Sequence, residues 1–476
     1  MASRILLVSA NRCAHPDPVF PLGISYVSAA LREAGHECIW LDSLADAEAF
    51  VDQLRSCNAD YAGISLRNID DVLIRRKETF YEDAAALVQL IRKELGCPVI
   101  LGGSGFSIFP EQLLALTGAD FGIAGEGERS LVELVKALET GADLKAIPGL
   151  VFWDADQVRR NPTKPGPGYG LTGAPERPAR ISTHYLQTGS MLNIQTQRGC
   201  AFRCCYCTYP VIEGRQHRRY PPEEIANEFE RVARAGARYV FLVDSVFNSS
   251  AQHVIETCEA LIRRGNKLPW GCFLRPQGLN SEQIRLLARA GLRHIEFGSD
   301  SFCDKVLAAY HKDFAFEEIL NSSALARETQ LDYCHFLISG GPGETYETLE
   351  EGFRNSQQLQ SAVIIAVVGM RIYPGTALSQ TALEERRIQA TSDLLKPIYY
   401  LSDAVTAEGV FARLQQFSQQ SPNWIVGDPD PAYQNLVTRL RQRGVAGPLW
   451  SYFSMIQRLW PQGVAQTAPT VIQPAA

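Results

Sequence analysis

The chain has 476 residues, of which 46% are hydrophobic and 21% are charged. This length exceeds what one ordinary hydrophobic core accommodates, so we expect two or three domains. A net charge of -6 at pH 7 excludes a general basic surface of the kind that holds nucleic acid. No stretch approaches the ~18 consecutive apolar residues that a membrane-spanning helix requires.

Cysteine usage indicates the redox compartment. Four of the twelve cysteines lie together at 200–207, and the others are scattered through the chain. Such scatter is not typical of a disulfide framework. The first residues lead directly into a strand-like run at 5–9, without the pattern of a signal peptide. We therefore expect a cytoplasmic protein.

Strand-like apolar runs alternate with helical patterns over residues 1–145. The runs cover 5–9, 38–41, 61–66, 98–101 and 121–124. This alternation predicts an α/β fold with a doubly wound, Rossmann-like parallel sheet. Ligands of such sheets bind beyond the carboxyl ends of the strands. The candidate binding residues at those ends are Ser65, Gly102, Gly103, Gly125 and Glu126.

The second half of the chain has its own strand-helix repeats. Residues 146–185 are rich in proline and glycine and are interpreted as a connection between domains. Six strand-like runs then follow within 186–380, at 192–196, 239–243, 270–274, 294–297, 333–338 and 364–368. They predict a partial (β/α)6 barrel whose reactive face lies at the carboxyl ends of the strands. Residues 381–476 have a helical, aromatic-rich pattern typical of a packing cap or a substrate lid.

The cysteine group carries the strongest chemical signal. Cys200, Cys204 and Cys207 form a CxxxCxxC motif, which supplies three thiolates where a four-iron cluster needs four ligands. One iron is then open to a cofactor or substrate, which favours chemistry over simple electron transfer. The alternatives are buried free thiols or a structural zinc site, but zinc sites usually add a second CxxC or a histidine pair, and none follows here. We interpret Cys205 as a bystander.

The residues around this motif resemble the signature of the radical S-adenosylmethionine (SAM) superfamily. Gln197-Arg198-Gly199 precedes Cys200, and the aromatic Tyr206 stands directly before the last cysteine. The resemblance implies a [4Fe-4S] cluster whose open iron binds the amino and carboxylate groups of SAM. An electron from a donor such as flavodoxin or ferredoxin would then cleave SAM to methionine and a 5′-deoxyadenosyl radical.

The N-terminal repeats resemble the cobalamin (B12)-binding domain that precedes the radical SAM domain in one large branch of this superfamily. The resemblance rests on the order of the two parts, on residues 21–26 and 125–128, and on Gly102-Gly103. It implies cobalamin as a further cofactor. The Asp-x-His-x-x-Gly element of classical cobalamin mutases is absent, because neither His15 nor His36 stands in that context. A Rossmann-like domain without the corrin is the alternative.

The same resemblance implies SAM-binding residues at the ends of the barrel strands. These are Asp244 and Ser245 after the second strand, Arg275 after the third, Gly298, Ser299 and Asp300 after the fourth, and Gly340 after the fifth. Ordinary structural roles are the alternative to SAM binding. Residues near 244–250 suit the N-cap of the following helix, and Arg275 suits an exposed surface position. Lys312 matches a lysine of the family, or is only a charge at a helix end.

The resemblance implies methylation of an unactivated centre in a lipid or secondary metabolite. One SAM would generate the radical, and a second would remethylate the cobalamin. A radical dehydratase or cyclase without methyl transfer is the alternative within enzymes, and a cobalamin or iron–sulfur sensor without turnover is the alternative outside them. We expect a small-molecule or lipid-like substrate, no nucleic-acid partner and no transmembrane segment.

Overall fold

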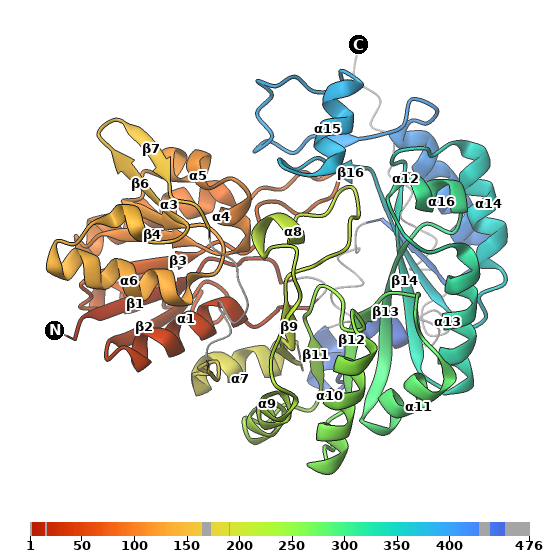
Figure 1. The fold of residues 1–476 in the computed structure, drawn as a ribbon, viewed down its shortest axis with the longest axis horizontal. Coiled ribbons are helices and arrows are strands. Elements are labelled where there is room, and N and C mark those ends of the chain that lie inside the picture. Colours follow the sequence, from red (N-terminus) through yellow and green to blue (C-terminus); the bar gives the residue numbers. More distant parts are fainter. Residues whose placement is uncertain (1, 15–16, 164–172, 190, 428–437, 453–476) are drawn as a thin grey trace.

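The computed structural model describes residues 2–14, 17–163, 173–189, 191–427 and 438–452. Two α/β parts lie side by side, an N-terminal one around the first sheet and a C-terminal one around the second (Figure 1). The first sheet has the strand order β2-β1-β3-β4-β5-β6-β7. Its strands are β1 (Arg4–Ser9), β2 (Glu37–Asp42), β3 (Tyr61–Ser65), β4 (Val99–Gly102), β5 (Phe121–Ile123), β6 (Leu150–Asp154) and β7 (Gln157–Arg160).

Helices cover both faces of this sheet, because its strands are apolar on both sides. In β1, Ile5 and Leu7 pack in one core with α1 (Leu22–Glu33) and α6 (Gly127–Thr140). The alternate residues Leu6 and Val8 pack in a second core. That core includes side chains of α2 (Phe50–Ser56), α3 (Tyr81–Leu95), α4 (Ser104–Ile108) and α5 (Pro110–Thr117). The first five strands are parallel, so the predicted doubly wound sheet is confirmed.

The last two strands of the first sheet form an antiparallel hairpin that the sequence did not predict. β6 pairs with β5 and β7 pairs with β6, both antiparallel. The apolar run at 151–153, placed in the predicted connection, therefore completes the N-terminal sheet. The chain then reaches α7 (Ala179–Thr188), while residues 164–172 of the predicted connection lie outside the described residues.

The second sheet is the partial barrel. Its order is β18-β15-β14-β13-β12-β11-β8, and every neighbouring pair is parallel. The strands are β8 (Leu192–Ile194), β11 (Val240–Leu242), β12 (Trp270–Leu274), β13 (Leu292–Asp300), β14 (Asp332–Ser339), β15 (Val363–Val368) and β18 (Trp424–Val426). The first six correspond to the six predicted repeats. β18 was not predicted, because its three residues follow a long helical pattern.

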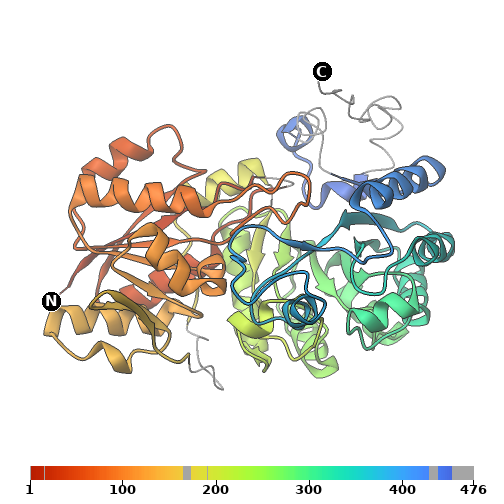
Figure 2. The same ribbon diagram turned by 90° about the horizontal axis from the view of Figure 1, so that it is seen from above.

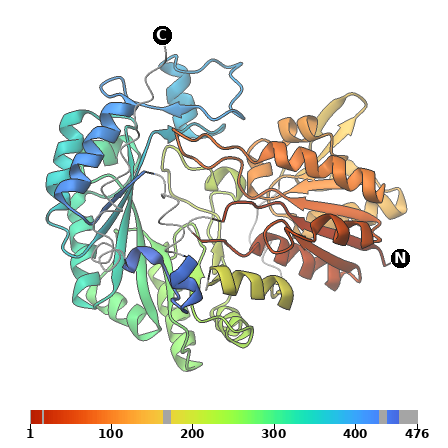
Figure 3. The ribbon, with the colours of Figure 1, turned by 180° about the vertical axis from the view of Figure 1, so that it is seen from behind.

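Helices surround the outside of the barrel. They are α9 (Pro222–Arg234), α10 (Ala251–Arg263), α11 (Ser281–Arg289), α12 (Asp304–Ala309), α13 (Phe316–Glu328), α14 (Tyr346–Ser356) and α16 (Ala407–Gln420). α16 stands among them and leads the chain back to β18 (Figure 3). The remaining elements are α15 (Ala377–Glu384), β16 (Met370–Arg371), β17 (Tyr399–Tyr400) and two short 3₁₀ helices, η1 (Leu144–Ala146) and η2 (Leu449–Tyr452). Among the described residues, no helix is long and apolar enough to cross a membrane.

A loop of the N-terminal part reaches across to the barrel. It follows β3, and in Figure 2 it is the orange loop that extends over the second half of the molecule. Asp70 in this loop accepts a hydrogen bond of 2.8 Å from Nε of Arg371, and both side chains are almost fully buried. Tyr373 also donates to Asp70 over 3.2 Å. The guanidinium of Arg75 lies 3.5 Å above the ring of Phe411.

Replacing Asp70 with Asn should destabilise the protein, because the charge of Arg371 would remain buried without its counter-ion. Breaking one side of a buried pair costs about 3–5 kcal/mol. Urea unfolding should therefore show a clear fall in the free energy of unfolding. Glu37→Gln, which removes one side of the exposed Arg4–Glu37 pair, is the matched control and should cost about 0–1 kcal/mol. Equal losses in the two variants would contradict this account of the loop.

Candidate functional site

The cysteine loop is held in a defined shape before any cofactor binds. It follows β9 (Gln197–Arg198), which pairs antiparallel with β10 (Arg218–Arg219). Gly199 begins the loop with a left-handed φ of 81°, and a Cβ there would collide with the backbone carbonyl of Gln216. Only glycine therefore fits. The N–H of Cys200 donates to the carbonyl of Gly214 over 3.0 Å, which ties the loop to the chain that follows it.

The three motif cysteines share one loop and are close enough to influence each other's titration. Cys200 is buried, and Cys204 and Cys207 are partly exposed. Burial raises the pKa of Cys207 to about 12, and the pKa of Cys200 also rises. A positive metal centre is what would hold such thiols as thiolates. Cys205 instead packs with its sulfur 3.9 Å from the sulfur of Met370, as expected for a bystander.

The ligand set fits a cluster better than a single metal ion. Among the described residues, no group of three ligating side chains is close enough to hold one ion. A cubane has a different requirement, because each thiolate binds its own iron and the sulfur atoms stay apart. Cys200, Cys204 and Cys207 supply three such thiolates from one loop.

Asp244 and Ser245 brace the cysteine loop. Asp244 is almost completely buried and accepts hydrogen bonds from the N–H of Thr196 at 2.6 Å, the hydroxyl of Thr196 at 2.5 Å and the N–H of Gln197 at 3.2 Å. Ser245 donates to the carbonyl of Gly199 over 3.2 Å. Both carboxylate oxygens of Asp244 are thus occupied by the chain itself. Its predicted contact with SAM stays a prediction, whereas Ser245 lies directly beside the loop.

Asp300 and Lys312 form a buried pair next to the loop. The ammonium of Lys312 pairs with Asp300 and donates to the carbonyl of Gly298 over 3.2 Å. Tyr206, from the cysteine loop, donates to Asp300 over 2.5 Å. Asp300 has a left-handed φ of 67° beside an irregularity in the β13–β14 pairing. The sequence left Lys312 as a possible helix-end charge, and the structure places it inside the site.

Arg275 is buried beside the cysteine loop rather than exposed. Its guanidinium lies 3.8 Å above the ring of Phe202, which belongs to that loop, and one amino group pairs with Asp313. Its Nε is buried without a hydrogen-bond partner in the described part of the chain. An unpaired donor of this kind is costly unless a ligand accepts from it. The observation supports the predicted contact with an anionic group.

Ser299 does not join the other predicted residues. Alternate residues of a strand point to opposite faces, and its hydroxyl lies 2.8 Å from Nδ1 of the buried His335. Gly298 and Asp300 face the other way, toward Lys312. Gly340, after β14, has a left-handed φ of 92°, and a Cβ there would press against Leu401. The period-two pattern of strands was the available signal that Ser299 differs.

The predicted residues of the N-terminal part gather at the carboxyl edge of the first sheet. Ser65 and Gly102 end β3 and β4, which pair with each other. Gly103 has a φ of 100°, and a Cβ there would collide with the backbone of Leu66. The absence of a side chain at Gly103 therefore lets the loops after β3 and β4 pack closely. The N–H of Gly125 donates to the hydroxyl of Ser107 over 2.8 Å.

Glu126 connects this edge to the cysteine strand. Its carboxylate pairs with Arg218 of β10, with one bond of 2.8 Å, and lies 3.5 Å from Arg198 of β9. Arg198 also pairs with Glu128 over 2.7 Å. All four side chains are at least nine-tenths buried. Glu126 was predicted as a cobalamin contact; that role stays a prediction, and in the structure its carboxylate holds two arginines.

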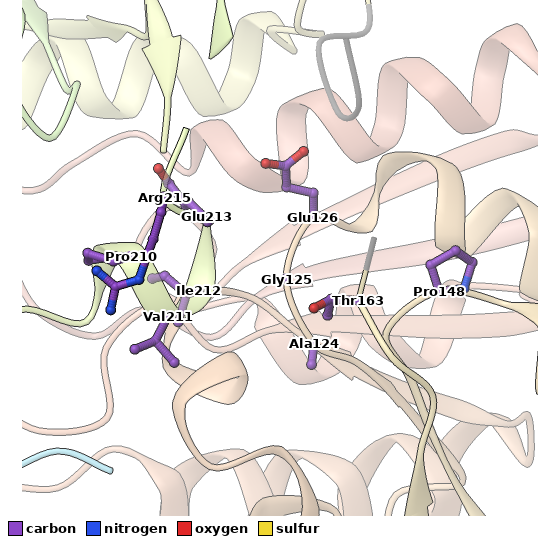
Figure 4. Close-up of a pocket in the computed structure, with 11 residues that line it drawn as sticks. Ala124, Gly125, Glu126, Pro148, Thr163, Pro210, Val211, Ile212, Glu213 and Arg215 are labelled. Carbon is purple, nitrogen blue, oxygen red and sulfur yellow. The ribbon is translucent and has the colours of Figure 1, made fainter. Parts of the chain in front are cut away.

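A cavity of about 270 Å³ opens where the two parts meet (Figure 4). From the N-terminal part it is lined by Ala124, Gly125, Glu126, Pro148 and Thr163. From the other side it is lined by residues 210–215, which include most of α8 (Tyr209–Ile212) directly after Cys207. The carboxyl edge of the first sheet and the cysteine loop are therefore neighbours.

Two family models match the chain. The radical SAM superfamily matches residues 194–354, and the B12 binding domain matches residues 13–135. The chain belongs to the radical SAM superfamily and carries a B12-binding domain. The first match contains the three motif cysteines, and the second contains the whole predicted ligand edge from Ser65 to Glu126.

Similar proteins match most of the length of this chain. The tryptophan 2-C-methyltransferase of Streptomyces laurentii is 24% identical, over 80% of this chain and 74% of its own. The hopanoid C-3 methylase of Methylococcus capsulatus is 25% identical, over 76% and 70%. The solved structure of the radical SAM methyltransferase TsrM from Kitasatospora setae superposes with a TM-score of 0.87 at 23% identity, covering 97% of this chain and 100% of that one. This likeness confirms the fold.

Iron binding should depend on three of the four clustered cysteines. Anaerobically reconstituted protein should bind about four irons and four sulfides, because the three thiolates define one cluster. Replacing Cys200, Cys204 or Cys207 with Ala should abolish iron binding, and Cys205→Ala is the matched control that keeps it. Iron and sulfide analysis with the visible absorption spectrum measures this. Zinc in place of iron after anaerobic purification would contradict the cluster.

The pH dependence of stability should report on Asp244. Burial raises its pKa from 3.8 to about 7, so the folded protein binds this proton more tightly than the unfolded chain. Protonated Asp244 stabilises the folded protein fully below about pH 4, and this stabilisation is lost as the pH rises through 7. Asp244→Asn keeps an acceptor for both backbone N–H groups and removes the titration. The variant should therefore gain stability relative to wild type between pH 5 and pH 8, measured by urea unfolding.

The exposed Asp52 on α2 provides the control for this experiment. Asp52→Asn should follow the wild-type curve at each pH, since its side chain is 87% exposed. An Asp244→Asn curve that also stays parallel to wild type would contradict the shifted pKa.

Proposed function

We propose that this chain is a cobalamin-dependent radical SAM methyltransferase that methylates an unactivated centre of a small molecule. The observation that carries the proposal is the junction of the two parts. α8, which follows Cys207 directly, lines the same cavity as Gly125 and Glu126 of the B12-binding domain. A ligand on the N-terminal edge and a ligand on the cysteine loop would thus be neighbours, as transfer of a group between them requires.

We propose the following residues as the ones that would hold each cofactor. Cys200, Cys204 and Cys207 would bind the [4Fe-4S] cluster. Around SAM, the unpaired Nε of Arg275 suits a carboxylate, and the ribose and adenine would lie along Gly298, Asp300 and Gly340. The corrin would rest against Ser65, Gly102, Gly103 and Gly125, with its periphery in the cavity. When bound, the cluster supplies the electron that cleaves SAM, and the corrin carries the methyl group.

The cobalt would have no histidine ligand from the described residues of this edge. His36 lies just before β2 and accepts from the N–H of Ser3, just before β1, so it stands at the amino end of the sheet. His15 lies outside the described residues. A corrin without such a ligand is suited to carrying a methyl group between SAM and substrate.

The chain's own contribution is positioning and exclusion of water. Lys312, Asp300 and Tyr206 form a buried chain of contacts from β13 to the cysteine loop. These contacts fix the loop relative to the barrel strands before SAM binds, so that less conformational freedom is lost on binding. We propose a flavodoxin or ferredoxin as the electron donor.

A second enzymatic function has support from a relative. The anaerobic magnesium-protoporphyrin IX monomethyl ester cyclase of Cereibacter sphaeroides is 26% identical over 70% of this chain. A radical cyclisation without methyl transfer is therefore the competing proposal. The cavity between the two parts supports methyl transfer, because it brings the carboxyl edge of the B12-binding domain beside the cysteine loop.

The co-products distinguish these functions. Cobalamin-loaded, reduced enzyme with SAM and its substrate should release 5′-deoxyadenosine and S-adenosylhomocysteine in comparable amounts, since each methylation consumes one SAM for hydrogen abstraction and one for remethylation. Liquid chromatography with mass spectrometry quantifies both, with Cys200→Ala as the inactive control. Deoxyadenosine without substrate-dependent S-adenosylhomocysteine would indicate cyclisation or dehydration. Neither product with bound substrate would indicate a sensor.

A further inference from the structure

The inner face of the barrel sheet is lined by side chains that keep partial exposure. In β11, β12, β14 and β15, residues that are fully buried against the outer helices alternate with apolar residues that keep partial exposure. The partly exposed residues include Phe241, Phe273, Phe336, Ile365 and Val367. Alternate residues of a strand share a face, so these residues point to the inside of the barrel. Their partial exposure leaves apolar surface there for a ligand to contact.

Aromatic rings dominate this inner face. The rings of Phe241 and Phe273 are edge to face with centroids 5.0 Å apart, and Phe273 and Phe336 are 6.4 Å apart. On the other side, Phe241 stacks on His294 at 5.6 Å. His294 in turn meets the ring of Trp450 edge to face at 5.6 Å. A wall of this kind favours a flat aromatic ligand, which it contacts through edges and faces.

One carboxylate lies in this aromatic wall. Glu296 is on β13 between His294 and Gly298, on the inward face. One of its oxygens accepts a hydrogen bond of 3.0 Å from the indole N–H of Trp450. The other accepts none from the described residues, while the side chain keeps 12% of its surface exposed. A carboxylate with a spare acceptor is therefore presented to the interior.

No cation in the described part of the chain neutralises Glu296. The one basic group within 4 Å is His294, at 3.7 Å. Burial lowers the pKa of His294 to about 3, so this ring is neutral. Asp17, which approaches from the N-terminal part, is paired with Arg441 over 2.6 Å. Burial raises the pKa of Glu296 to about 7, although the hydrogen bond from Trp450 lowers it, so the side chain is a carboxylate above that pH.

The position of Glu296 suits contact with a substrate. It stands two residues before Gly298 on β13, and residues of a strand rise about 3.3 Å each. Glu296 thus lies roughly 7 Å from Gly298 along the strand, and the pairing of β13 with β14 is irregular beyond Phe297. A ring-sized molecule that contacts Glu296 would extend from there toward Gly298, where we place SAM.

We propose that the barrel interior binds a flat aromatic substrate with a ring N–H donor, and that Glu296 accepts that donor. The reaction of this substrate rests on the proposed function, whereas its binding does not. Of the lipid and the secondary metabolite that the sequence suggested, this hydrogen bond favours a nitrogen-containing aromatic metabolite, because a wholly apolar ligand would offer no donor to the second oxygen of Glu296. Glu296 is thus a specificity-determining residue.

Binding of paired probes tests this without turnover. Full-length protein with its cluster reconstituted, and no SAM, is dialysed to equilibrium against indole, 1-methylindole, tryptophan or 1-methyltryptophan. Wild type should bind each N–H compound at least about tenfold more tightly than its N-methyl partner, because a hydrogen bond to a charged acceptor has that effect. Glu296→Leu should lose this preference, and Glu296→Gln, which keeps a neutral acceptor, should retain part of it.

The matched control is Glu282→Gln, which changes an exposed carboxylate at the start of α11 on the outside of the barrel. It should keep the full preference. Iron content and thermal unfolding establish that each variant is folded. Equal binding of the N–H and N-methyl probes by wild type, an undiminished preference in Glu296→Leu, or no binding of any N–H probe would overturn the inference.

The binding inference and the proposed methyl transfer can be rejected independently of each other. A Glu296-dependent preference with no S-adenosylhomocysteine formed in turnover would leave the binding inference standing and reject the methyltransferase. Methyl transfer to a saturated lipid that is unaffected by Glu296→Leu would overturn the binding inference and leave the methyltransferase standing.

Discussion

The buried ion network between the two parts is the interaction on which the site depends. Arg198 stands two residues before the first cluster cysteine, and its charge is compensated by Glu126 and Glu128 of the B12-binding domain. Arg218, on the strand paired with it, is compensated by the same Glu126. A buried charge is tolerated only with its partner in place. The cysteine loop therefore has its native position only when the N-terminal domain is docked against it.

This constraint explains how two ordinary α/β units produce one reactive centre. Each sheet offers its carboxyl edge, and the ion network sets those edges against each other. Asp70 and Arg371 make a second buried link on the other side of the site. With two such links the junction resists relative movement of the domains. The distance between a methyl carrier and SAM is then a property of the fold rather than of the ligands.

The sequence predicted the fold and the cluster because these rest on local patterns. Strand-helix alternation recurs every few tens of residues, and the cysteine spacing lies within eight positions. Contacts between distant segments left no such signal. The pairing of Glu126 with Arg218 spans 92 residues, so the sequence did not indicate that this carboxylate also holds the two parts together. Lys312 was similarly underestimated, because its burial depends on the fold of the loop around it.

Two residues of β13 show what the alternation of strand side chains could have added to the prediction of the site. Ser299 follows Gly298 in a sequence that resembles the family, but its place in an alternating strand turns it toward His335 and away from the site. The same alternation places Glu296 on the face of Gly298. Glu296 was overlooked because a single acidic residue in an apolar strand has no motif of its own. Its lack of a cationic partner becomes visible only in three dimensions.

The cobalt and the cluster are expected to share one site at the junction of the two domains. Electron paramagnetic resonance of protein that holds both cob(II)alamin and the reduced cluster tests it most directly. The account predicts that the two paramagnets interact, so that each spectrum differs from that of protein holding either cofactor alone. Two spectra that simply add, with no broadening or splitting at low temperature, would place the cofactors apart and contradict the account.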